Sequence, residues 1–106
     1  METLLVLTNC PHRDCAEDIA REVVEARLAA CVNILAPCLS IYSWEGRVDQ
    51  AEEVPVLIKT TTACYPALEA TIRRRHPYEV PEIIALPITH GLPAYLNWVA
   101  EETLKP

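Results

Sequence analysis

The stretch His76-Pro77-Tyr78-Glu79-Val80-Pro81-Glu82-Ile83-Ile84 determines where the second half of the chain changes from helix to strand. Its two prolines lie four residues apart, and proline is excluded from helix interiors and from central strands. Residues 76–82, the polar corner, are therefore predicted to form a stiff, irregular connection. Such a connection holds an imidazole, a phenol and two carboxylates in fixed directions.

Arginines at positions 73–75 precede the polar corner and predict the end of a helix, because cations stabilise the C-terminus of a helix dipole. Apolar residues 83–86 follow it and predict a strand, in which Pro87 is expected at a sheet edge or a bulge. The same patterns of apolar runs and helical periodicity extend over the rest of the chain. They predict strands at residues 4–8, 31–35 and 82–88, a long hairpin at 39–60 with a turn at 45–47, helices ending near residues 29 and 76, and a last helix starting after residue 93. The run at residues 4–8 is continuously apolar, so this strand is expected to be central in its sheet.

The starts of the helices follow capping patterns. Asp14 is the expected N-cap of the first helix, because its side chain can accept from free amides while Glu17 reaches back. Thr61 or Thr62 is expected to cap the second helix, with Pro66 in its first turn.

The predicted order is β-α-β twice, followed by a helix with Tyr95, Trp98 and Val99 on its buried side. Two interleaved units of this kind give an α+β fold, a ferredoxin-like β-α-β-β-α-β sandwich with a C-terminal helix. Its antiparallel sheet carries helices on one face only. Tyr42, Trp44 and Leu57 would then expose large apolar surface on the second face, and exposed patches of this kind mark interfaces. The chain is therefore predicted to form a homo-oligomer.

The composition limits the class of protein. The 106 residues suffice for a single domain, residues 1–106, and no segment approaches the roughly 20 apolar residues of a membrane span. The net charge of −6 argues against nucleic-acid binding, which depends on Lys and Arg. The first residues lack the pattern of a signal peptide, and the five cysteines show no C-x-x-C spacing. We therefore expect a cytoplasmic protein with reduced thiols and neither nucleic-acid nor membrane partners.

Several stretches, taken together, resemble the CutA divalent-cation tolerance proteins. The match covers nearly the whole chain, in order. It implies a trimer similar in fold to the PII signalling proteins, with the long hairpin joining subunits and clefts between them. It also implies copper or another divalent metal as a partner. The matching stretches are Leu28-Ala29-Ala30-Cys31-Val32-Asn33-Ile34, Tyr42-x-Trp44-Glu45-Gly46, Ile58-Lys59-Thr60-Thr61 and the polar corner itself.

The resemblance also implies metal ligands. In members with assigned copper ligands, these are a cysteine ending the first strand and two consecutive histidines opening the polar corner. Thr8 and Arg75 stand at two of these positions, and His76 matches the third. Cys31 matches a family cysteine at the start of the second strand. His76 is thus either a ligand or a residue that holds the corner by hydrogen bonds, and Cys31 is either a ligand or a small buried apolar residue.

A further candidate comes from the residues alone. Cys10-Pro11-His12 with Cys15 forms a C-x-H-x-x-C cluster, and soft thiolates with an imidazole suit copper(I) or zinc. The spacing lacks a fourth ligand and matches no closed site. Cys10 therefore joins His76 and Cys31 as a candidate metal ligand.

The inter-subunit cleft is expected to be lined by Tyr42, Trp44, Lys59, Tyr78 and Glu79. Lys59 is either solvated or a cleft residue that pairs with Glu79 or with an anionic ligand. The first functional hypothesis is a homotrimer that binds copper or other divalent metals in the response to metal ions. The alternative is a PII-like regulatory module that binds a small ligand in this cleft.

A third hypothesis is an enzyme in which Glu79 or Glu82 forms an acid–base pair with His76. The sequence shows no nucleophile with a positioned base, and its only glycines, at positions 46 and 91, cannot form a phosphate-binding loop. We therefore predict a protein that is not an enzyme.

Overall fold

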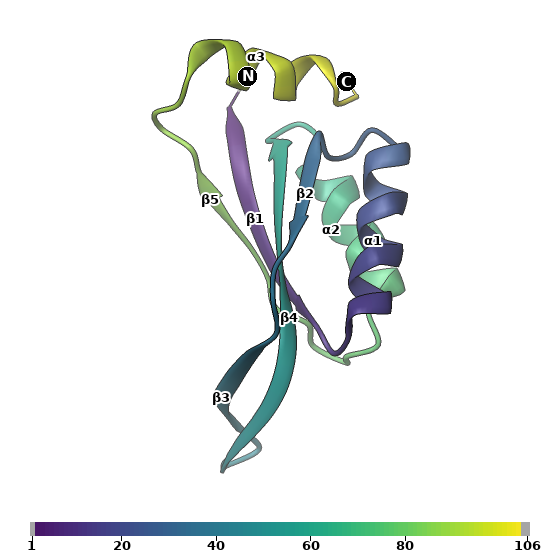
Figure 1. Ribbon diagram of the computed structural model, residues 1–106, viewed down its shortest axis with the longest axis vertical. Helices are drawn as coiled ribbons and strands as arrows, with labels where there is room; N and C mark the ends of the chain where they lie inside the picture. Colours follow the sequence, from purple (N-terminus) through teal and green to yellow (C-terminus); the bar gives the residue numbers. More distant parts are fainter. Residues whose placement is uncertain (1, 105–106) are drawn as a thin grey trace.

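The computed structural model describes residues 2–104, which form one antiparallel sheet and three helices (Figure 1). The sheet order is β2-β4-β1-β5, and β3 pairs with β4 beyond this path. This arrangement confirms the predicted α+β class and ferredoxin-like order. The elements are β1 (Thr3–Cys10), α1 (Arg13–Glu25), β2 (Cys31–Ile34), β3 (Cys38–Trp44), β4 (Arg47–Thr61), α2 (Tyr65–Arg75), β5 (Ile83–Pro87) and α3 (Pro93–Glu101).

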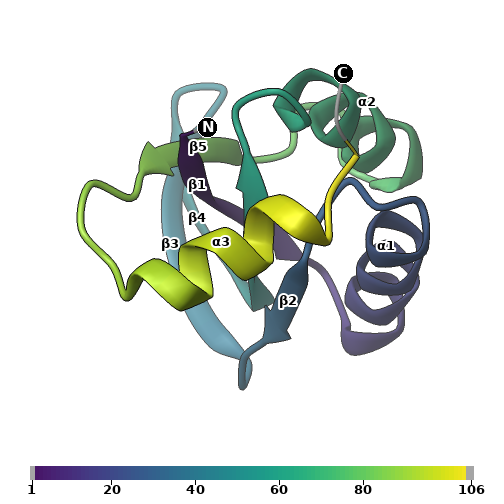
Figure 2. The same cartoon turned by 90° about the horizontal axis from the view of Figure 1, so that it is seen from above.

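β1 lies in the interior of the sheet, as its apolar run predicts, with β4 on one side and β5 on the other. Its residues alternate between fully buried and half-buried. α1 and α2 lie side by side on one face of the sheet (Figures 1 and 2). The core between them contains Val6, Ile19, Val23, Val56, Ile58, Leu68 and Ile72.

β5 forms one edge of the sheet, which is the position that Pro87 predicts. Pro87 lies opposite Leu4 at the end of the strand, and proline cannot donate to a further ladder. At this residue the edge strand therefore has no backbone N–H group that would need a hydrogen-bond partner.

β4 is a single strand of 15 residues that serves two parts of the molecule. Its second half pairs with β1 and β2, and its first half pairs with β3. The hairpin of β3 and residues 47–53, here called the arm, projects from the body and gives the chain a length of 44 Å (Figure 1). The arm turns at Glu45 and Gly46, whose φ angles of 51° and 76° are those of a two-residue hairpin turn.

The first helix begins and ends differently from the prediction. His12, and not Asp14, is the N-cap of α1, and its Nδ1 accepts from the Cys15 amide at 3.3 Å. The helix ends at Glu25 because Arg27 adopts a left-handed φ of 60°. The predictions of an Asp14 cap and of a helix extending to residue 29 are wrong.

The second helix also differs at its start. Cys64 occupies the N-cap position of α2 and makes no side-chain capping bond, so the prediction of a cap at Thr61 or Thr62 is wrong. Pro66 does lie in the first turn, and the three arginines occupy the last turn. The helix ends at His76, as predicted from the polar corner.

The face of the sheet opposite α1 and α2 is only partly covered. α3 lies across one end of the sheet, packs against β4 and β1 and buries Val99 (Figure 2). Tyr95 and Trp98, predicted on its buried side, are 39% and 40% exposed in the single chain.

Among residues 2–104, no helix is long and apolar enough to span a membrane. The large apolar side chains exposed on β5 and the arm are Leu39, Ile41, Tyr42, Trp44, Val48, Ile84 and Leu86.

Candidate functional site

His76 holds the polar corner against the end of β1. The residue is 7% exposed, and Nε2 donates to the Asn9 carbonyl at 2.6 Å. Nδ1 accepts from the Tyr78 amide at 3.2 Å, so the neutral imidazole protonated on Nε2 satisfies both contacts. The ring also packs against that of Tyr78, with centroids 4.7 Å apart. Both nitrogens of His76 are thus used within the chain.

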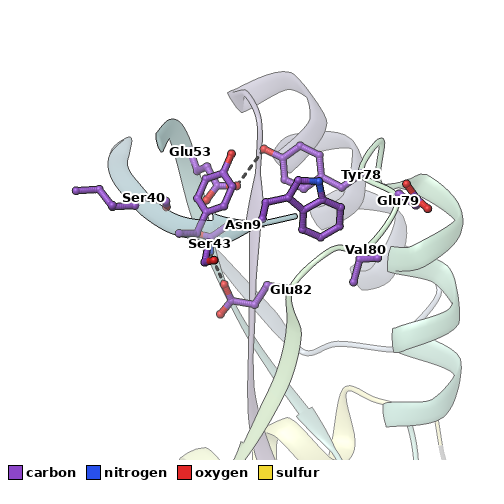
Figure 3. Close-up of a pocket in the computed structure, with 11 residues that line it drawn as sticks. Asn9, Ser40, Ser43, Glu53, Tyr78, Glu79, Val80 and Glu82 are labelled. Carbon is purple, nitrogen blue, oxygen red and sulfur yellow. Dashed lines mark hydrogen bonds between the residues drawn. The ribbon is translucent and has the colours of Figure 1, made fainter. Parts of the chain in front are cut away.

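A pocket of about 650 Å³ lies between the polar corner and the arm (Figure 3). Tyr42, Trp44, Tyr78 and Glu79, four of the five residues predicted for the cleft, line it. Lys59 lies outside this pocket, and its ammonium donates to the side-chain oxygen of Asn33. The other lining residues are Asn9, Ser40, Ile41, Ser43, Glu53, Val80 and Glu82.

Two side-chain hydrogen bonds join the walls of the pocket (Figure 3). The Tyr78 hydroxyl donates to Glu53 Oε2 at 3.0 Å, and Asn9 Nδ2 donates to Glu82 Oε1 at 2.9 Å. Burial and then the bond to Glu53 raise the pKa of Tyr78 to about 12, so its hydroxyl remains a donor at neutral pH. The first bond joins the polar corner to β4, and the second joins β1 to the polar corner. Together they fix the position of the polar corner relative to the two strands.

The pocket carries negative charge. Glu53, Glu79 and Glu82 line it, and no lysine or arginine lines it in the part of the chain that the structure describes. Glu53 is only 9% exposed, and none of the ion pairs formed within residues 2–104 involves it. Sequence reasoning missed Glu53, because its position in the polar returning half of the hairpin gives no sign that its side chain is buried.

Cys10 and Cys15 bring two thiols together beneath the start of α1. Cys10 ends β1, Cys15 lies in the first turn of α1, both are buried, and their thiols lie close enough to interact. Burial, then Cys15 and Glu53, raise the pKa of the Cys10 thiol from 9.0 to about 12. The thiol is therefore protonated at neutral pH. His12, the third member of the predicted cluster, uses Nδ1 to cap the helix.

Cys31 lies apart from Cys10. It is half-buried at the start of β2, and its thiol donates to Asn33 Oδ1 at 3.9 Å and hydrogen-bonds with the Tyr95 side chain. Cys31 lies opposite Lys59 on β4 whereas Cys10 lies opposite Val54, which separates them by about 17 Å along the strand. The two cysteines cannot bind one ion within a single chain.

The positions where the resemblance places further copper ligands have other roles. Thr8 is 1% exposed, and its hydroxyl has no hydrogen-bond partner among the described residues. Arg75 pairs with Glu22 of α1, as does Arg74. Within residues 2–104, no group of three His, Cys, Asp or Glu side chains converges as a metal site.

The family model of the CutA1 divalent ion tolerance protein matches residues 4–102. The chain belongs to this family. It is 48% identical over 99 residues to the divalent-cation tolerance protein CutA of Thermus thermophilus, covering 93% of this chain and 96% of that protein. It is 50% identical over 94 residues to the mouse protein CutA, covering 89% of this chain but only 53% of the mouse protein. The chain thus spans about half the length of this mammalian relative.

Solved CutA structures have the same fold. CutA1 of Shewanella sp. SIB1 superposes with a TM-score of 0.95 at 47% identity, covering 98% of this chain and 97% of that one. CutA1 of Oryza sativa gives a TM-score of 0.96 at 35% identity, covering 100% and 97%. The resemblance deduced from the four stretches is therefore confirmed. The family is described by divalent-cation tolerance and not by a catalysed reaction.

Proposed function

We propose that this CutA protein is a cytoplasmic homotrimer that contributes to tolerance of divalent cations by binding copper or another divalent metal. The tolerance role is supported by the names of the relatives. The metal-binding role is carried by one observation, the paired thiols of Cys10 and Cys15. A cytoplasmic location agrees with five unpaired cysteines, because reducing compartments keep thiols free.

The trimer is supported by the apolar surface of the arm and of β5. Ile41 and Leu39 are 67% and 60% exposed, and Ile84 and Leu86 are about half exposed. Patches of this kind are covered in stable proteins, and closed symmetric assemblies are the usual way to cover them. Light scattering should give three times the 11.9 kDa chain mass, and a stable particle of one chain mass would refute the trimer.

Cys10 and Cys15 suit copper(I), which soft thiolates select over harder cations. Binding would replace the proton of the Cys10 thiol, so metal binding releases protons. The raised pKa of Cys10 makes protons strong competitors, and apparent affinity should therefore increase with pH. Copper is the more suitable ion because two thiols alone do not complete the four-ligand shell of zinc.

Cys31 and His76 remain the other candidate ligands. Cys31 would act near the C-terminal end of β4, opposite Lys59, with the Tyr95 hydroxyl as its neighbour. His76 would bind through Nε2 only after giving up its hydrogen bond to the Asn9 carbonyl. Each would therefore form a separate site from the Cys10 pair, or one completed by another copy of the chain.

Competition for copper(I) against a coloured chelator, under reducing and anaerobic conditions, tests the ligands. Cys10→Ser and Cys15→Ser should each weaken binding at least about tenfold, because each removes one of two thiolates. Cys38→Ser is the matched control, since the Cys38 thiol is exposed on the arm. Identical binding by all variants would reject the thiol pair. A loss confined to Cys31→Ser or His76→Gln would move the site to that residue.

The second candidate function is a PII-like regulatory module that binds a small ligand. The pocket favours it, because about 650 Å³ lies within the usual range for ligand sites and four predicted cleft residues line it. A ligand at 100 times its Kd should stabilise the fold by about 2.7 kcal/mol in a thermal-shift panel of metabolites. A broad panel without a stabilising compound would count against this function.

A further inference from the structure

Glu53 is a buried acidic residue, and none of the ion pairs within residues 2–104 involves it. The residue is 9% exposed, and among residues 2–104 its carboxylate accepts a side-chain hydrogen bond only from the hydroxyl of Tyr78. Burying a charge costs free energy unless an opposite charge or several hydrogen bonds compensate for it. Because Glu53 lines the pocket, a cation in the pocket could supply this compensation.

The walls of the pocket are aromatic as well as acidic. Tyr42, Trp44 and Tyr78 line it together with Glu53, Glu79 and Glu82. Cations are attracted to the faces of aromatic rings, most strongly for tryptophan, and the attraction grows as the cation loses water. Pockets that combine aromatic rings with carboxylates are the usual recognition sites for ammonium groups.

A bare metal ion does not fit this arrangement. Metal sites need several oxygen, nitrogen or sulfur atoms at about 2 Å from one point. No such group of three His, Cys, Asp or Glu side chains converges within residues 2–104, and Glu82 is already bonded to Asn9. A larger cation, whose charge is surrounded by alkyl groups, can contact the rings and the separated carboxylates at the same time.

We propose that the pocket between the arm and the polar corner binds a small organic cation, a quaternary ammonium or an alkyl amine. Its charged group lies near Glu53, and its alkyl groups contact Tyr42, Trp44 and Tyr78. The inference rests on the second candidate function, because it names the ligand class of that pocket. Its ligand differs from copper, although the pocket lies near the proposed copper site, because Glu53 is close enough to Cys10 to raise the pKa of that thiol.

A pair of ligands of one shape tests the proposal on the intact protein. Choline carries a trimethylammonium group, and the alcohol in which a tert-butyl group replaces it has the same shape without the charge. Calorimetric titration should show choline binding at least about tenfold more tightly than the neutral alcohol. Equal affinities, or no binding of choline, would overturn the proposal.

Glu53→Gln removes the charge but keeps an oxygen that can accept from Tyr78. It should weaken choline binding at least about tenfold, because the attraction between unit charges is lost. Glu25→Gln, an equal change of charge on the exposed end of α1, should leave it unchanged. Equal choline binding by the Glu53 variant and the wild type would also overturn the proposal. If the Glu53 variant does not fold, the comparison of the two ligands decides by itself.

The metabolite panel separates this inference from the function on which it rests. Stabilisation by a neutral or anionic compound, together with no binding of choline, would leave the regulatory function standing and reject the organic cation. No stabilisation by any compound, choline included, would reject both. Choline binding that depends on Glu53 would support both.

Discussion

Replacing His76 by alanine tests whether the polar corner depends on this ring. The imidazole bridges two segments, because it donates to the Asn9 carbonyl at 2.6 Å and accepts from the Tyr78 amide at 3.2 Å. His76→Ala leaves both backbone groups without a protein partner. It also removes the ring that packs against Tyr78. The variant should therefore be destabilised without losing its overall fold.

The size of the effect follows from these contacts. A buried polar group left without a partner costs about 1–3 kcal/mol, and two such groups are created. Water entering the vacated space recovers part of this cost, because the corner lies next to the open pocket. The free energy of unfolding should therefore fall by about 2–4 kcal/mol.

Urea denaturation at neutral pH measures this change. The buffer should contain a reductant and a metal chelator, and the protein concentration should be the same for all variants, because bound ions and assembly both shift apparent stability. His90→Ala is the matched control, since His90 is exposed and its ring bonds only the neighbouring Thr89 among residues 2–104; it should change stability by less than about 0.5 kcal/mol. A His76 variant as stable as this control would refute the structural role derived for the ring.

Four further outcomes are expected. Cys38 should react with a maleimide at neutral pH while buried Cys10 reacts only on unfolding, and mass spectrometry showing equal labelling rates would contradict the burial described above. The pKa of Cys10 is raised by folding from 9.0 to about 12, so the protonated thiol stabilises the fold fully below pH 9.0 and loses this effect as the pH rises towards 12. Cys10→Ala should therefore flatten the fall in unfolding free energy over this range, and an unchanged slope would contradict the shift. Tyr78→Phe should lower the free energy of unfolding by about 1 kcal/mol in denaturant titration, through loss of the bond to Glu53. The double variant Tyr78→Phe, Glu53→Gln should lose the energy of this bond only once, so its loss should be smaller than the sum of the two single losses. Trp44→Asp should shift the particle mass in light scattering towards the 11.9 kDa chain, and a mass identical to the wild type would place Trp44 outside the interface.

The order of strands and helices could be predicted from the sequence because their periodicity is strong. The prolines at positions 66 and 87 marked a helix start and a sheet edge, and both positions are confirmed. The helix ends were predicted less well. His12 caps α1 although imidazole is not among the usual capping groups, and Arg27 ends that region in a left-handed conformation without the glycine that normally signals it.

The candidate site could be predicted only in part. The polar corner itself supplied Tyr78, and the alternation of the hairpin supplied Tyr42 and Trp44, so these residues were found before the fold was known. Glu53 was not, because its burial depends on contact between the arm and the corner, and no local pattern records that contact. The spacing of Cys10 and Cys15 suggested that they lie together. It could not show that Nδ1 of His12 is used to cap α1 and is therefore not free to join this cluster.

β4 runs without interruption from the arm into the core, so the number of residues between them sets the orientation of the arm relative to the core. Successive side chains of a strand point to opposite sides, so the count that buries Val56 and Ile58 also sets which way the arm presents its residues. One residue inserted after Glu53 would turn the whole arm over while leaving the body intact. Insertions and deletions should therefore be tolerated in the turn at Glu45 and Gly46. Within β4, only insertions or deletions of two residues should preserve the orientation of the arm.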